Sequence, residues 1–287
     1  MLTIHEFRLV QLPLRTADDN SLAIPGYLIF HHAHGLFTPL YLVLAILFLP
    51  SCKVQNQTPE ALFIEHRHLE AIPISFAIGY VLPISLMCLA APRFLSYRFK
   101  DTVTGLYQQW HLIIEAVHYT VVWSTSCMVR SGMSRLEYSP ETSGLTLELM
   151  RTNYVVAMAL TALPYWVVSI FSVASWLAPT LFNPKIVHSL HPKWVLVPTW
   201  PRKNLKASDP RDGFRWLIQW DILLGTTAVV IWAMALRTYA AEKQNMWANS
   251  WWRYFLKAVG YFFVGGPNGI AVGFMWERDE IAFGRLR

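Results

Sequence analysis

The segment from Trp110 to His118 carries two histidines and a carboxylate inside an otherwise apolar stretch of the chain. His111, Glu115 and His118 are spaced by four and three residues, so a helix places them on one face, and Tyr107 extends that face by one turn. An ionisable group in membrane hydrocarbon costs from about 3 to more than 10 kcal/mol. We therefore expect these groups to face a partner, a wet cavity or a substrate. Two interpretations stay open, a structural Glu115–His111 pair and a functional site.

The composition places this segment in a membrane protein. More than half of the 287 residues are apolar, only 15% are charged, and 13 are tryptophans, a residue typical of membrane interfaces. Six segments are long enough to cross a hydrocarbon core of about 30 Å. We therefore predict an all-α polytopic integral membrane helix bundle with about six, and at most eight, transmembrane helices. The segments are about 27–49, 71–91, 107–129, 154–181, 215–236 and 254–276.

Basic residues outside these segments predict the orientation of the chain. Lys and Arg are more numerous in the two tails and in the loops at 92–106 and 183–215 than in the alternating loops. We therefore expect both termini in the cytoplasm. Asn56 begins an Asn-x-Thr sequon in a loop that this topology makes lumenal, which predicts glycosylation there. The sequence predicts a single transmembrane domain over residues 1–287, in the endoplasmic reticulum, with a long cytoplasmic loop at 183–213.

Further carboxylates lie near the ends of the fifth and sixth predicted segments. Asp221 follows Trp220 about six residues into the fifth, and Glu277 follows Trp276 at the end of the sixth. In this topology their depth, at about 1.5 Å per residue, matches that of Glu115, so we predict a single polar chamber in the cytoplasmic half of the membrane. The run from Gly265 to Gly269, which contains Asn268, indicates either a packing kink or backbone that opens toward this chamber.

Carboxyl groups, aromatic rings and a pocket without water together favour carbocation chemistry. Removal from water raises the pKa of a carboxyl group, which can then donate a proton near neutral pH. The faces of indole and phenol rings stabilise a passing cation. We therefore predict acid-initiated carbocation cyclisation of an isoprenoid that enters from the bilayer. The candidate catalytic residues are Glu115, Asp221, His111 and Glu277, and the candidate substrate-binding residues are Tyr107, Trp110, His118, Trp220, Trp276 and Asn268.

Competing enzyme classes need motifs that this sequence does not contain. The run His31-His-Ala-His34 does not supply the several histidine boxes of membrane di-iron desaturases. Asp18-Asp19 is not the Asp-rich magnesium motif that ionises a diphosphate, and no glycine-rich phosphate loop precedes a lysine. We expect no metal or other cofactor, no nucleic-acid partner, and a reaction without loss of diphosphate.

Two resemblances point to the same chemistry. The fragment from Trp110 to Glu115 resembles the His-Leu-x-x-Glu core of the sterol Δ8–Δ7 isomerase (emopamil-binding) family, whose members hold a carbocation between membrane carboxylates and a tryptophan. Gln219-Trp220-Asp221, with the stretch from Gly265 to Glu280, resembles the membrane-bound cyclases of fungal meroterpenoid pathways. Those proteins protonate an epoxide or olefin on a farnesylated aromatic.

The second resemblance implies an isomerase or cyclase of secondary metabolism. Its partners would be membrane lipid and a lipophilic isoprenoid substrate, and a prenyltransferase and an epoxidase would be its pathway neighbours. The alternatives are a double-bond shift of the sterol-isomerase kind and a non-enzymatic transporter or lipid-binding protein. Only one glycine-rich interruption is present, whereas a transporter of this size usually has matched, repeated ones.

Overall fold

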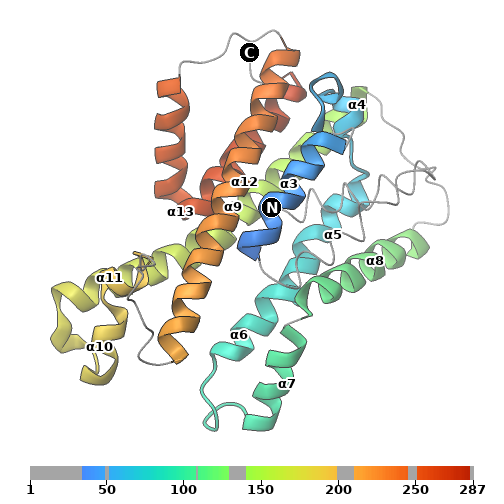
Figure 1. Cartoon of the computed structure of the whole chain (residues 1–287). Helices are drawn as coiled ribbons and strands as arrows, with labels where there is room; N and C mark the ends of the chain where they lie inside the picture. Colours follow the sequence, from blue (N-terminus) through green and yellow to red (C-terminus); the bar gives the residue numbers. More distant parts are fainter. Residues whose placement is uncertain are drawn as a thin grey trace. The chain divides into compact units, whose positions relative to one another are not determined.

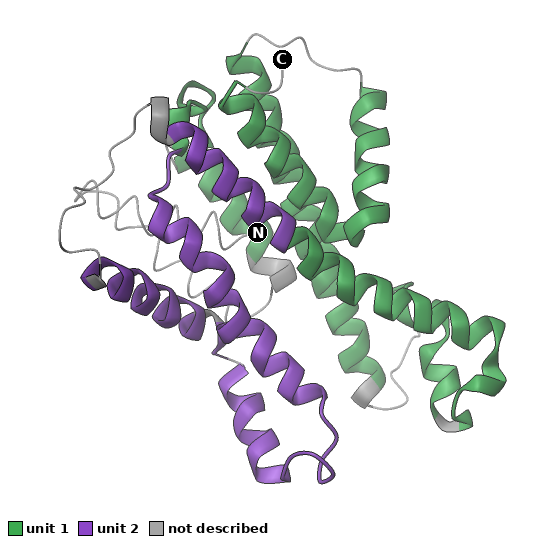
Figure 2. Ribbon diagram, turned by 180° about the vertical axis from the view of Figure 1, so that it is seen from behind, with its two compact units in different colours: residues 1–62, 157–287 green, residues 63–156 purple. Residues whose placement is uncertain are grey.

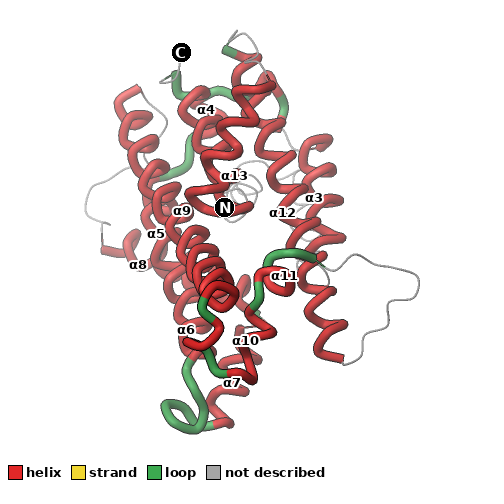
Figure 3. The backbone as a smooth tube through the Cα atoms, turned by 90° about the vertical axis from the view of Figure 1, so that its left-hand side faces the viewer, coloured by secondary structure: helices red, strands yellow, loops and turns green. Residues whose placement is uncertain are grey.

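Helices make up all of the regular structure that the computed structural model describes. It describes residues 34–48, 52–107, 109–128, 140–198, 210–244 and 251–284, and within these ranges no strand is present (Figure 3). A helix satisfies its backbone hydrogen bonds internally, which is why apolar segments that face hydrocarbon adopt it. The predicted all-α class is confirmed.

By length and composition, four helical stretches are candidates to cross a membrane: His66–Cys88, Ser143–Leu177, Asp212–Lys243 and Trp251–Ala282, the last of which has a non-helical residue at Gly266. They correspond to the second, fourth, fifth and sixth predicted segments, and they indicate a membrane protein. The first predicted segment forms α3 (His34–Phe48), an apolar helix of 15 residues that is shorter than the four stretches above. The third forms α8 (Trp110–Met128), whose polar residues lower its hydropathy. The membrane orientation and the cellular location remain predictions.

The chain divides into two compact units, which Figure 2 distinguishes by colour. Unit 1 contains residues 1–62 and 157–287, and unit 2 contains residues 63–156. The long helix α9 (Pro140–Leu177) contributes to both units. The single domain over residues 1–287 remains a prediction.

Unit 1 is organised around the helix α12 (Pro210–Lys243), which packs against α3 and against α13 (Trp251–Ala282) (Figure 1). Trp232 and Leu236 on α12 and Phe274 on α13 are almost fully buried. Elsewhere the surface of α12 exposes large apolar side chains, as a lipid-facing helix does. Unit 1 also contains the short helical elements η2 (Val54–Asn56), α4 (Pro59–Leu62) and η4 (Pro179–Leu181).

The segment predicted as a loop at 183–213 contains two short helices and the start of a third. These are α10 (Pro184–Leu190), α11 (Pro192–Val195) and the first residues of α12. Each of the three begins at a proline. The fixed φ of proline suits the first position of a helix, and its missing N–H is not needed there. The prolines of this connection therefore start helices, and the long cytoplasmic loop at 183–213 remains a prediction.

Unit 2 consists of α5 (His66–Phe76), the π-helical turn η3 (Ala77–Val81), α6 (Leu82–Cys88), α7 (Tyr97–Tyr107), α8 and the start of α9. The helices α5 and α8 pack together, and η3 packs against α8. Gly79 of η3 lies against Ile114 of α8, where a Cβ on the glycine would come within 2.6 Å of the Ile114 Cγ1 atom and 2.9 Å of its backbone nitrogen. The missing side chain lets the two elements approach closely.

The Gly79→Ala variant is expected to lower the free energy of unfolding by about 1–3 kcal/mol, because the added methyl group overpacks a backbone contact. The matched control is Gly105→Ala in α7, where nothing lies within 4 Å of the added carbon. That variant should be neutral or slightly stabilising, since alanine favours a helix over glycine. Thermal unfolding of both variants in detergent measures the difference, and equal midpoints would contradict the close packing of η3 on α8.

Candidate active site

Glu115 lies on α8 with a half-buried side chain, directly after Ile114, which packs on η3. Among the described side chains, no hydrogen bond or ion pair holds its carboxylate. His111 lies one turn earlier on the same helix, but its side chain is outside the described residues. The structural Glu115–His111 pair therefore remains open, and the described part of unit 2 leaves the carboxylate available for a reacting molecule.

Three aromatic side chains meet on the same side of unit 2. The ring of Tyr80, on η3, contacts Trp110 edge to face at 5.3 Å between centroids and Tyr107 at 6.0 Å. Trp110 begins α8, so it lies on the same helix as Glu115, a little more than one turn before it. Sequence reasoning selected Tyr107 and Trp110 but missed Tyr80. The signal for Tyr80 was the adjacent Gly79, which brings η3 against α8.

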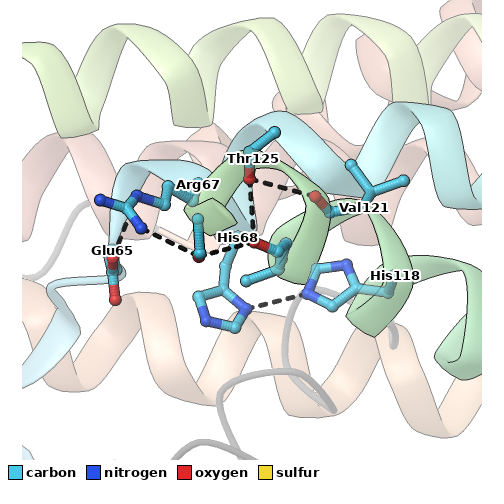
Figure 4. Close-up of polar contacts among 8 residues, drawn as sticks. Glu65, Arg67, His68, His118, Val121 and Thr125 are labelled. Atoms are coloured by element: carbon cyan, nitrogen blue, oxygen red, sulfur yellow. Dashed lines mark hydrogen bonds and ion pairs between the residues drawn. The ribbon is translucent and has the colours of Figure 1, made fainter. Parts of the chain in front are cut away.

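His118 is fully buried and pairs with a histidine of α5 (Figure 4). The Nδ1 atom of His68 lies 2.9 Å from the Nε2 atom of His118, and the two rings are stacked. One nitrogen must donate and the other accept, so the two rings share a proton. Beside them Arg67 donates to the Ser126 hydroxyl over 2.9 Å and contacts Glu65 at 3.7 Å. These contacts hold α5 against α8, and the role of His118 in substrate binding remains a prediction.

Asp221 and Trp220 lie half-buried on α12 in unit 1. Glu115 belongs to unit 2, so its predicted convergence with Asp221 in one chamber remains a prediction. Within unit 1, however, the structure separates Asp221 from Glu277. Glu277 is paired with Arg237, which follows Asp221 by sixteen residues on α12, about 24 Å along the helix. The prediction that Asp221 and Glu277 share one depth is therefore wrong, because α13 does not run as the sequence predicted.

Glu277 is the centre of a buried cluster of charges between α12 and α13. Arg237 donates from Nε to the Oε2 atom over 2.7 Å, and the Tyr261 hydroxyl donates to Oε1 over 2.7 Å. The Lys257 Nζ atom lies 2.8 Å from Oε1, and the Arg237 guanidinium stacks over the Tyr254 ring at 4.4 Å. The carboxylate is thus saturated by three partners, which favours a structural role. Its predicted catalytic role remains a prediction.

The other predicted residues of unit 1 have nearby partners. Trp276 donates from Nε1 to the Glu280 Oε1 atom over 3.0 Å, and Asn268 accepts at Oδ1 from the Thr226 hydroxyl over 3.1 Å. Among the residues that the structure describes, no group of three or more His, Cys, Asp or Glu side chains could hold a metal ion. Asn56, at the end of η2, is half-exposed, and its glycosylation remains a prediction.

Comparisons with known proteins identify the family. The model of the CtvD domain matches residues 20–283. The chain is 23% identical over 254 residues to the terpene cyclase ascI of Acremonium egyptiacum, covering 86% of this chain and 59% of that protein. It is 24% identical to the terpene cyclase penA of Penicillium crustosum, covering 71% and 52%, and 24% identical to the terpene cyclase ctvD of Aspergillus terreus, covering 74% and 54%.

The chain spans between half and three fifths of the length of these relatives. No solved structure matches it. The family model, by contrast, extends over almost all of the chain, including α8 with Glu115, α12 with Asp221 and the cluster around Glu277. This protein therefore belongs to the CtvD domain family.

Proposed function

We propose that this protein is a membrane-bound terpene cyclase that starts ring closure by donating a proton to an isoprenoid. The observation that carries the proposal is the Glu115 carboxylate, half-buried and without a described partner, on the helix that also presents Trp110. The relatives named terpene cyclase support the class of reaction. A carboxyl group that serves only the fold would be paired, as Glu277 is.

In the proposed reaction the neutral carboxyl group of Glu115 protonates an epoxide oxygen or a carbon of an alkene. The bond that breaks is the epoxide C–O bond or the alkene π bond, and a neighbouring alkene attacks the cationic carbon to close the ring. The faces of Trp110, Tyr80 and Tyr107 stabilise the positive charge as it moves. Loss of a proton from a carbon next to the final cation ends the reaction, so substrate and product have the same composition.

Asp221 is proposed as the second carboxylate of this reaction, either as the alternative proton donor or as the base that removes the last proton. The proposed substrate class, a farnesylated aromatic, is what the resemblance to fungal meroterpenoid cyclases implies, and the membrane location supports it. A farnesylated aromatic partitions into a bilayer, and a site in a membrane helix bundle reaches it without passing through water. We further propose that the protein lies in the endoplasmic reticulum, that Asn56 carries a glycan, and that a prenyltransferase and an epoxidase supply the substrate.

The proposal is tested by incubating microsomes that contain the protein with epoxidised and olefinic farnesylated phenols and with sterols. The expected result is a ring-closed isomer of unchanged mass from a farnesylated phenol, and no such isomer in microsomes without the protein. If a sterol with a shifted double bond forms and no phenol is cyclised, the protein is a sterol isomerase and not a cyclase. If none of these compounds is converted, both the cyclase and the isomerase activity are contradicted.

A further inference from the structure

The apolar stretch from Trp251 to Ala282 is two helices rather than one. At Gly266 the backbone has φ of 68° and ψ of −163°, a conformation outside the helical region, and Pro267 follows it. A positive φ is accessible to glycine at little cost, and proline suits the first position of the helix that follows. The first arm therefore covers residues 251–265, and the second covers residues 267–282.

The two arms lie side by side and run in opposite directions. A Cβ on Gly273 would come within 2.5 Å of the Tyr261 ring, so these residues are in contact. Four residues earlier on the first arm, Lys257 reaches Glu277, which lies four residues later on the second. Gly269 also lies against the backbone oxygen of Tyr261. Glycines on the second arm thus let the arms approach closely, and the pairing defines an antiparallel hairpin.

The second arm runs parallel to α12. Thr226 of α12 bonds Asn268 at the start of this arm, and Arg237, further along α12, bonds Glu277 further along the arm. Ala240 and Ala241 then cluster with Ile281. The end of α12 and the end of α13 therefore lie at the same end of unit 1, and Figure 1 draws α13 with its two arms beside α12.

The lengths of these helices decide which of them crosses the membrane. Each arm of α13 has 15 or 16 residues, about 22–24 Å at the rise of an α-helix, which is shorter than a hydrocarbon core of about 30 Å. The 34 residues of α12 extend over about 51 Å and are long enough. A hairpin of two short arms that returns to its starting end enters the membrane without crossing it.

We propose that α13 is a re-entrant hairpin, which enters and leaves the membrane at the face where α12 ends and carries Asn268 to its tip. The chain after Ala282 then emerges on the same face as residues 245–250, and on the opposite face from residues 199–209. This path conflicts with two predictions from the sequence, namely that segment 254–276 crosses the membrane and that both termini lie on the same face. With the C-terminal tail on the other face, the lysines and arginines outside the membrane segments are nearly equal in number on the two faces.

The hairpin gives Asn268 a use at the tip, and this part of the inference rests on the proposed function. Its side chain is exposed, and its Oδ1 atom accepts from Thr226, which orients the amide nitrogen. An amide donor that faces hydrocarbon is unfavourable unless it has an acceptor. The geometry assigns the Asn268 amide as a hydrogen-bond donor to an oxygen atom of the substrate.

The hairpin is tested by glycosylation mapping of the full chain in microsomes. Asn56→Gln removes the native sequon, and a single new acceptor is then placed in a flexible insert within residues 245–250, in a flexible extension after Arg287, or, as the control, in an insert within residues 199–209. The acceptors within residues 245–250 and after Arg287 should either both be glycosylated or both stay unmodified, and the acceptor within residues 199–209 should show the opposite state. If only one of the first two acceptors is glycosylated, the hairpin is overturned. Single cysteines at these sites, labelled by an impermeant maleimide, give the same comparison without a glycan.

The role of the tip is tested separately by Asn268→Leu, with Thr226→Val as the variant that frees the amide without removing it. The expected result for Asn268→Leu is a KM raised about tenfold, the equivalent of about 1.4 kcal/mol, with a smaller change in kcat and an unchanged glycosylation pattern. An unchanged KM would overturn the contact with the substrate and leave the hairpin in place. The glycosylation map needs no substrate, so a failure of the proposed function does not affect it.

Discussion

Glu115→Gln is expected to lower the rate of cyclisation by about 10²–10⁴, the contribution of a general acid. Glutamine keeps the shape and the hydrogen-bonding capacity of the side chain but has no proton of suitable acidity to donate. Because no described side chain bonds the Glu115 carboxylate, the variant loses no contact that holds the fold together. The protein should insert into the membrane and unfold at the same temperature as the parent. Turnover of a farnesylated phenol in microsomes, normalised to the amount of protein, measures the effect.

Two further variants separate catalysis from structure. Asp221→Asn should also cost about 10²–10⁴ if Asp221 donates or accepts a proton in the reaction. Trp220→Phe should cost much less, because a phenyl ring keeps most of the stabilisation of a cation. A structural salt bridge at Glu115 would give the reverse pattern, with poor expression of the glutamine variant and near-normal turnover of the protein that survives. Activity retained in both amide variants would exclude these two carboxylates as the acid.

Glu277→Gln is expected to destabilise the protein by about 3–5 kcal/mol, the cost of removing one partner from a buried ion pair. Arg237 is only 2% exposed and loses its carboxylate, whereas Lys257 is about half-exposed and can turn toward solvent. The hairpin also loses the bond from the Tyr261 hydroxyl to a charged acceptor. Denaturation in detergent should therefore shift to a markedly lower temperature.

The matched control for this cluster removes the two buried charges, those of Arg237 and Glu277, at once. The double variant Arg237→Met and Glu277→Met leaves no buried ion without a partner, because Lys257 is about half-exposed and can turn toward solvent. Replacing a buried ion pair by apolar side chains is often neutral or stabilising. Its unfolding temperature should lie well above that of Glu277→Gln. A Glu277→Gln protein as stable as the parent but without activity would contradict the structural role and favour the catalytic one.

The sequence predicts the helical class and most of the apolar segments, because hydropathy depends on composition along one helix. It does not predict how a segment turns. The run from Gly265 to Gly269 indicated a kink, but only the contact of Tyr261 with Gly273 and of Lys257 with Glu277 identifies an antiparallel hairpin. The glycine-rich pattern alone does not tell whether the helix after the break continues in the same direction or folds back against the first arm.

The same holds for the candidate site: residues that stand out within one segment could be predicted, whereas contacts between segments could not. Glu115, Trp110 and Tyr107 could be selected because they stand out within one stretch of sequence. Tyr80 and His68 stand out less in their own stretches of sequence, because their importance depends on partners in α8, 30 and 50 residues away along the chain. Asp221 and Glu277 were both conspicuous, yet their common depth depended on the path of α13, which the sequence pattern does not determine.

The fate of the proton tests the central claim most directly. If a carboxyl group of the protein starts ring closure, an olefinic substrate cyclised in D2O gains one deuterium on carbon, and an epoxide cyclised in H2O keeps its oxygen as a hydroxyl group. Both reactions should slow together in Glu115→Gln. A ring-closed olefin without deuterium, or an epoxide that loses its oxygen on cyclisation, would contradict the account.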